Sequence, residues 1–164
     1  MEIKYLQLLR DNPEEYPKNK EGRKHPIEPF SIVEIEQLES AYNSGKKFPL
    51  ALRELLFLAG NSCYVLEYGY KGNMESVQRI VWGNLARESK VMPRPFLAID
   101  IYNMLDQFLF VFLDEGDDPP VYEGYYSADY WEGDNGEWYR KIQPTLSIYI
   151  NRVVTRVQAG GSAF

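Results

Sequence analysis

The sequence has few of the residues on which most catalytic and metal sites depend. Its 164 residues include one cysteine, Cys63, and one histidine, His25. A single cysteine excludes an internal disulfide, and a single histidine with no nucleophile beside it argues against a zinc site or a nucleophile–base pair. There is also no phosphate-binding loop, dinucleotide fingerprint, Cys-x-x-Cys pair or nucleophile elbow. We therefore expect a protein that is not an enzyme and has no cofactor and no metal.

Long apolar runs and excess positive charge are also missing. No apolar run approaches the ~18 residues of a membrane span, and no basic start followed by an apolar run indicates a signal peptide. We expect a cytoplasmic protein. The 18 Lys and Arg residues against 24 Asp and Glu give a net charge of −6. This balance argues against a nucleic-acid partner, which needs a basic surface, and favours either a cationic partner or simple solubility.

Aromatic residues, in contrast, are abundant. They make up 15% of the chain and include 13 tyrosines. Tyrosine suits contact surfaces because it combines a large area with a polar tip and little side-chain entropy. The alternative is a β-rich core with half-exposed tyrosines around it, and composition leaves both interpretations open.

The strongest local pattern predicts a helix hairpin over residues 31–60. Ser31 and Glu34 form a capping box at the start of the first helix, and Gly45 can take the left-handed conformation that ends one. Pro49 fits the first turn of a second helix, which Gly60 ends. Two apolar stripes recur at helical spacing, with Glu36, Glu39 and Ser40 off the first: Ile32, Ile35, Leu38 and Tyr42, then Leu52, Leu55, Leu56 and Ala59.

The remaining elements follow in chain order, with no repeat or linker that divides them. Helices are predicted over 2–10, over 75–89 with a weak point at Gly83, and over 145–157; strands are predicted over 62–68, 96–101, 107–113, from 120 to 123, and over 138–142. We expect the last residues, 159–164, to form a flexible tail. We expect a single domain over 1–164 with its core in 31–157 and an α+β fold.

Two blocks of the sequence resemble the SUKH superfamily. The first has Ile35-x-x-Leu38-Glu39, a loop, Phe48-Pro49 and a Leu-rich helix ending in Gly60-Asn61, where the family usually has Leu-Pro and Gly-Gly. The second has an apolar run over 108–113, an acidic turn with Gly over 114–118, and Pro120-Val121-Tyr122. The resemblance covers about residues 31–157. It implies one twisted, mainly antiparallel sheet with helices packed against it, an N-terminal helix hairpin and a C-terminal helix.

Residues 114–137 hold nine carboxylates and no Lys or Arg. Three interpretations compete: hydrated acidic turns, a surface that recognises a partner, and a pair of hydrolase or metal-binding carboxylates. In the second, acids steer a basic partner and aromatic side chains anchor it. The candidate partner-binding residues are Glu115, Asp117, Asp118, Tyr122, Tyr125, Tyr126, Asp129, Tyr130 and Trp131.

The resemblance also carries an expectation about function. Many bacterial members of the superfamily are immunity proteins, so it implies a protein that binds and neutralises a cognate toxin domain, here a basic one such as a nuclease. The family is named partly for a yeast regulator of cell-wall synthesis, and the alternative is therefore a housekeeping adaptor in cell-wall synthesis or signalling. A carboxylate-dependent glycoside hydrolase is the third hypothesis, and it requires two acids facing one cleft.

Overall fold

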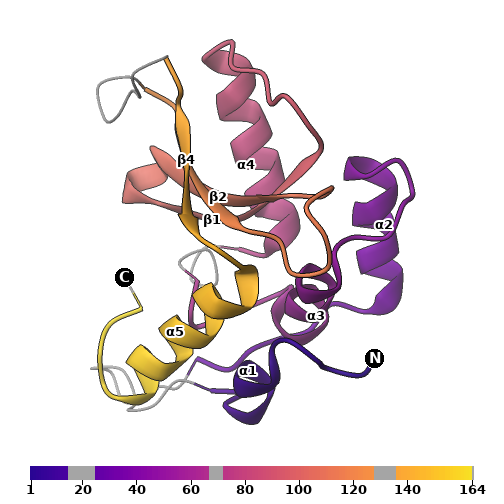
Figure 1. The fold of residues 1–164 in the computed structure, drawn as a ribbon, viewed down its shortest axis with the longest axis vertical. Helices are drawn as coiled ribbons and strands as arrows, with labels where there is room; N and C mark the ends of the chain where they lie inside the picture. The colour runs from indigo at the N-terminus through magenta and orange to yellow at the C-terminus, as the bar shows by residue number, and fades with distance from the viewer. Residues whose placement is uncertain (15–24, 67–71, 128–135, 164) are drawn as a thin grey trace.

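A computed structural model describes residues 1–14, 25–66, 72–127 and 136–163, and these form an α+β fold with one sheet. The four strands are antiparallel and lie in the order β1-β2-β3-β4 (Figure 1). The strands are β1 (Phe96–Tyr102), β2 (Gln107–Phe112), β3 (Val121–Tyr125) and β4 (Tyr139–Gln143). The helices are α1 (Gln7–Asp11), α2 (Ile32–Tyr42), α3 (Leu50–Ala59), α4 (Met74–Arg87) and α5 (Leu146–Gln158). The predicted fold class is thus confirmed.

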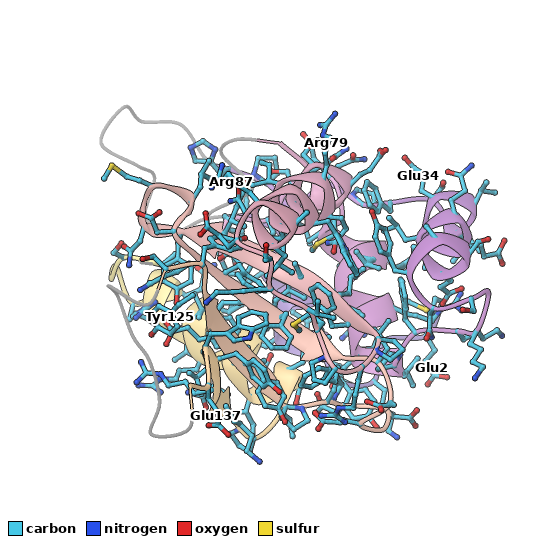
Figure 2. The ribbon with its side chains drawn as sticks, turned by 90° about the horizontal axis from the view of Figure 1, so that it is seen from above. Glu2, Glu34, Arg79, Arg87, Tyr125 and Glu137 are labelled. Carbon is cyan, nitrogen blue, oxygen red and sulfur yellow. The ribbon has the colours of Figure 1, made fainter. Side chains whose placement is uncertain are left out.

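Helices pack on both faces of the sheet. On one side α4 packs against β1, and on the other α5 packs against β4, α1 and α3. Phe108, Phe110 and Val111 on the central strand β2 are fully buried between these layers. Seen from above, α4 lies over the β1 side of the near face, and α5 lies behind β4 on the far face (Figure 2). One face of the β3–β4 half is therefore the part of the sheet that the described helices leave uncovered.

The predicted helix hairpin is confirmed, with a change in the role of one acid. The Ser31–Glu34 capping box is formed, and Gly45 has a left-handed φ of 76°. Glu39, expected off the apolar stripe, is buried instead. Its Oε1 accepts the Phe48 backbone N–H at 2.7 Å and the Arg53 guanidinium at 3.0 Å. The carboxylate can be buried because it accepts these hydrogen bonds from the link between α2 and α3 and from α3 itself.

A second buried carboxylate shortens the first helix. Helix α1 begins at Gln7 rather than near residue 2. The backbone N–H groups of Lys4, Tyr5 and Leu6 donate to the carboxylate of Glu54 on α3, at 2.8–2.9 Å. Because these N–H groups bond the Glu54 carboxylate, residues 4–6 are not helical. They precede α1 and are hydrogen-bonded to α3.

The strand predicted over 62–68 is wrong where the structure describes it. Residues 63–66 form a turn, in which the Leu66 N–H donates to the Cys63 carbonyl at 3.2 Å, and Ser62 makes only an isolated bridge to Glu28. Cys63, Tyr64, Val65 and Leu66 are all buried, without the alternation of a half-buried strand. Residues 67 and 68 lie outside the described part of the chain.

Helix α4 runs without a break through Gly83, the predicted weak point. Its buried Gln78 connects the helix to the outer edge of β1, where the side-chain amide bonds both the carbonyl and the N–H of Ala98, at 2.7 and 3.1 Å. The β1–β2 register shifts between Ala98 and Asp100. Gln78 therefore supplies hydrogen bonds to the backbone groups of Ala98 at the edge of β1, where no other described strand pairs with them.

The chain after α5 turns back on the helix. The N–H of Gly160 donates to Val157 and that of Gly161 to Arg156. Ala163 is partly buried against the core, and its carbonyl accepts a hydrogen bond from the Arg156 guanidinium. These contacts hold residues 160–163 beside α5.

Candidate functional site

The uncovered half of the sheet carries a layer of aromatic side chains. Register places Tyr122 of β3 and Tyr139 of β4 on the same face as Phe108, Phe110 and Phe112 of β2. The phenylalanines are buried, whereas Tyr122, Tyr139 and the adjacent Trp138 are half-buried. We call Tyr122, Trp138 and Tyr139 the aromatic face. It is an outer layer over the buried phenylalanines, and each of its three residues remains partly accessible to solvent.

Ring packing fixes the side chains of the aromatic face. The Tyr122 ring stacks on Phe110 with centroids 5.4 Å apart and meets Phe112 edge-on at 5.0 Å. Trp138 and Tyr139 meet edge-on at 5.3 Å. These are the favoured geometries for aromatic pairs. Because the rings are already ordered, little side-chain entropy remains to be lost when a partner covers them.

Two cations from the segment before β1 border the aromatic face. The Arg94 guanidinium lies 3.8 Å from the centroid of the Phe112 ring, and Lys90 Nζ lies 5.0 Å from that of Trp138. Arg94 also pairs with Asp114 at 3.0 Å and with Glu115 at 2.8 Å. The first two carboxylates of the acidic segment are thus compensated by an arginine from outside it.

Glu115 belongs to the edge of the aromatic face. Its Oε1 accepts the Tyr122 hydroxyl at 3.1 Å, and burial together with this carboxylate raises the pKa of Tyr122. Its Oε2 is buried and has no hydrogen-bond partner among the described residues. The structure therefore brings together two of the predicted partner-binding residues, Glu115 and Tyr122.

Asp117 and Asp118 lie in the same turn but differ in their surroundings. Asp118 accepts the N–H and the hydroxyl of Ser147 at 2.9 and 2.5 Å, so it caps the start of α5. This contact gives Asp118 a structural role that the sequence did not predict. Asp117 is exposed, and its backbone carbonyl accepts the N–H of Ala51 at the start of α3. Its carboxylate therefore remains available for steering.

Tyr125 points to the other face of the sheet. Its ring is 4% exposed, and its hydroxyl donates to Glu123, as does that of Tyr102. Arg140 pairs with the same carboxylate at 2.8 Å. Burial alone raises the pKa of Glu123, but the bonds from Tyr102, Tyr125 and Arg140 outweigh it and the pKa is lowered. Burial and Glu123 raise the pKa of Tyr125 to about 12.

Tyr126 is also buried rather than displayed. It is 4% exposed, and its ring stacks on Phe108 with centroids 5.0 Å apart. Burial raises the pKa of its hydroxyl. Tyr125 and Tyr126 are therefore packed core side chains in this structure, not exposed anchors. The other predicted residues, Asp129, Tyr130 and Trp131, lie outside the described part of the chain.

Sequence reasoning missed Trp138, Tyr139, Lys90 and Arg94 as members of the site. The pair Trp138-Tyr139 was assigned to the fourth strand, but pairing of that strand with β3 is what places its rings beside Tyr122. The aromatic pair Trp138-Tyr139 favours a strand by its β propensity, although it does not reveal the neighbouring strand. Lys90 and Arg94 reach the site through tertiary contacts alone.

Comparisons with protein-family models, with curated proteins and with solved structures found no match for this chain. In the part of the chain that the structure describes, no helix has the length and apolar character needed to cross a membrane.

Proposed function

We propose that this chain is a non-enzymatic protein-binding module and that the aromatic face is its contact surface. The observation that carries the proposal is the uncovered layer of Tyr122, Trp138 and Tyr139 on a sheet whose other parts pack against helices. Tyrosine, tryptophan and arginine are the residues most often responsible for binding energy at protein interfaces. Arg94, at the border, adds the third of these types.

The proposed partner is a basic protein surface. The chain has a net charge of −6. Exposed Asp114 and Asp117 lie in the turn after β2, and exposed Glu137 lies beside β4 (Figure 2). Such carboxylates raise the association rate of a cationic partner, while the aromatic face supplies contact area. The border also carries the cations Lys90 and Arg94, so the steering in this proposal comes from Asp117, Glu137 and the net charge of −6, which Arg94 does not compensate.

Together with the SUKH resemblance, this surface leads to a specific proposal. The protein is a cytoplasmic immunity protein that binds a toxin domain, such as a nuclease with a basic substrate cleft, and blocks it stoichiometrically. An acidic inhibitor with aromatic anchors is physically suited to cover a basic cleft. The housekeeping adaptor remains the alternative from the same resemblance, and it predicts a different partner.

Co-expression tests the proposal directly. Each toxin domain encoded beside the gene is expressed in a sensitive host with and without this chain, and growth is measured. Restored growth, with a one-to-one complex that dissociates as salt rises, is the expected result. No restored growth with any neighbouring toxin domain, together with capture of housekeeping proteins from the native host lysate, contradicts the immunity proposal in favour of the adaptor.

The kinetics of the complex test the steering carboxylates. Asp117→Lys is the suitable charge reversal, because Asp118 caps α5 and its substitution also changes stability. We expect Asp117→Lys to slow association and to flatten its salt dependence, with little change in dissociation. Unchanged association kinetics remove Asp117 from the steering surface.

A further inference from the structure

A cavity of about 740 Å³ lies on the opposite face of the sheet from the aromatic face, between the sheet and α5. Its apolar wall consists of Leu109, Ile142 and Val153 with the rings of Tyr102 and Tyr149. A mostly apolar cavity of roughly 300–1,000 Å³ with a few polar groups is the usual form of a small-molecule site. Asp100 is the carboxylate among its described lining residues, so these residues lack the pair of acids that glycoside hydrolysis requires.

Two arginines of α5, Arg152 and Arg156, line the same cavity. They are four residues apart, so they project from one side of the helix. Arg156 donates to the Ala163 carbonyl, and neither arginine forms an ion pair with any described residue. Ion pairs with carboxylates are made by Arg10, Arg53, Arg87, Arg94 and Arg140. Both guanidiniums are exposed at the mouth of an apolar cavity and have no carboxylate partner among the described residues, so they are available to the charged group of an anion whose apolar part enters the cavity.

Strained backbone at the rim of the cavity is an independent observation. The β1–β2 turn places Asn103, Met104 and Leu105 in the left-handed region, with φ of 48°, 54° and 76°. Left-handed non-glycine residues cost about 1–3 kcal/mol each and are found preferentially at ligand sites. Asn103 and Met104 line the cavity, and the Met104 side chain is 87% exposed. A large, exposed apolar side chain on strained backbone suits a rim that closes on a ligand.

We propose that this cavity binds a small organic anion, with its apolar body against the walls and its carboxylate or phosphate group at Arg152 and Arg156. Buried Asp100 has its own partner in the Ile101 N–H at 2.9 Å. Its carboxylate repels an anionic group and so directs that group toward α5. This site is separate from the aromatic face, and the proposal does not depend on the identity of any protein partner.

The test is an NMR titration of the full-length ¹⁵N-labelled chain with three probes that share an octyl body: octanoate, octyl phosphate and neutral octanamide. We expect at least one anion to bind about tenfold more tightly than octanamide and to shift the amides of Gln143 and Val153. The two anionic arms distinguish a carboxylate ligand from a phosphate ligand. Equal binding of octanamide, or no shift at about 10 mM of either anion, overturns the proposal.

Variants of the two arginines test whether they cause the preference for an anion over octanamide. Arg152→Gln and Arg156→Gln are each expected to weaken binding of the anion about tenfold while leaving octanamide within about twofold. Arg79→Gln on α4 is the matched control, since Arg79 does not line the cavity and makes no ion pair with the described residues. It is expected to have no effect. Anion binding that survives in the double variant Arg152→Gln/Arg156→Gln contradicts the assignment. If anion binding is lost while the amide spectrum shows an intact fold, the loss is local to the two arginines.

Discussion

Two buried carboxylates connect segments of the chain through hydrogen bonds. Glu54 is fully buried, and it accepts three backbone N–H groups from the segment that leads into α1. Glu39 is 3% exposed and bonds both the Phe48 N–H and Arg53. Buried charges are tolerated when hydrogen bonds of this kind surround them. In the SUKH-like pattern Ile35-x-x-Leu38-Glu39, the acid is thus a structural residue in this chain.

Replacement of Glu54 tests this role. Glu54→Gln removes the charge and leaves one amide oxygen for three donors, so we expect the free energy of unfolding to fall by about 2–3 kcal/mol. Chemical denaturation with urea measures the change. Glu36→Gln, an exposed acid on α2, is the control and should change stability by less than about 0.5 kcal/mol. Equal effects of the two substitutions would show that Glu54 has no special role.

Cys63 predicts a dependence of stability on pH. Its thiol is buried, and burial raises its pKa from 9.0 to about 12. Because the unfolded chain ionises this thiol above pH 9 while the folded chain keeps it neutral, the stabilisation is complete below pH 9 and is lost as the pH rises toward 12. We expect Cys63 to reduce stability at pH 10 by about 1.4 kcal/mol relative to pH 7.

Comparison with Cys63→Ala isolates this contribution, since other groups titrate in both proteins. Urea unfolding at pH 7 and pH 10 should show a loss that is smaller in Cys63→Ala than in the natural sequence. An identical pH dependence in the two proteins contradicts the prediction.

At the scale of single residues, the sequence predicts local chemistry better than long-range contacts. The Ser31–Glu34 capping box depends on residues three apart, and it was predicted. Glu54, Gln78 and Arg94 bond partners 48, 20 and 21 positions away, and no local pattern identifies them. Burial of Tyr125 and Tyr126 was missed because composition alone cannot tell which tyrosines face the core.

At the scale of elements, two glycines show how the same substitution has opposite effects. In β3, a Cβ on Gly124 would lie 2.6 Å from ring carbons of Phe108, so Gly124 allows that ring to lie directly against the strand. In α4, a Cβ on Gly83 would meet no atom within 4 Å. The first glycine is required by packing, whereas the second only weakens an exposed helix.

We therefore expect Gly124→Ala to lower the free energy of unfolding by about 1–3 kcal/mol through overpacking. Gly83→Ala should raise it by about 0.5–1 kcal/mol, because alanine restricts the unfolded chain and favours helix. Thermal and urea unfolding of both variants measures the difference. A stabilising Gly124→Ala would contradict the described packing of Phe108 on β3.

The β1–β2 turn provides another test. Met104 has a left-handed φ of 54° and is 87% exposed, so glycine there relieves strain with little loss of contact. Met104→Gly should stabilise the protein by about 0.5–1 kcal/mol, which is the relief of left-handed strain minus the entropic cost of glycine. Met104→Ala retains the strain and serves as the control. Equal unfolding midpoints for the two variants would show that the turn is not strained.

At the element scale, helical periodicity and β-rich runs predicted the five described helices and the four strands of the sheet. The ends shift by a few residues, most of all in α1, which begins at Gln7 rather than near residue 2. The strand over 62–68 failed because a short apolar run has the same composition whether it forms a strand or a buried turn. The segment contacts the core on all sides, as its uniform burial shows.

At the scale of the whole molecule, the two sides of the sheet differ in packing, and we propose a different binding role for each. Helices α4 and α5 lie on opposite sides of the sheet (Figure 1). Helix α4 packs against β1 on the side of the aromatic face, and residues of α5 line the cavity on the other side. The α+β architecture follows from the order of helices and strands in the sequence. The aromatic face cannot be predicted from that order, because it depends on the antiparallel pairing of β3 with β4. The middle of the connection between these strands lies outside the described residues.

The central claim is that the aromatic face binds a protein partner. The most direct measurement is the dissociation constant of the purified complex, by isothermal titration calorimetry, for the natural sequence, Trp138→Ala and Ile148→Ala. Ile148 is 48% exposed on α5, on the other side of the sheet, and serves as the control. We predict that Trp138→Ala weakens binding about 30-fold or more and that Ile148→Ala changes it less than about twofold. Unchanged affinity of a folded Trp138→Ala variant would contradict the claim.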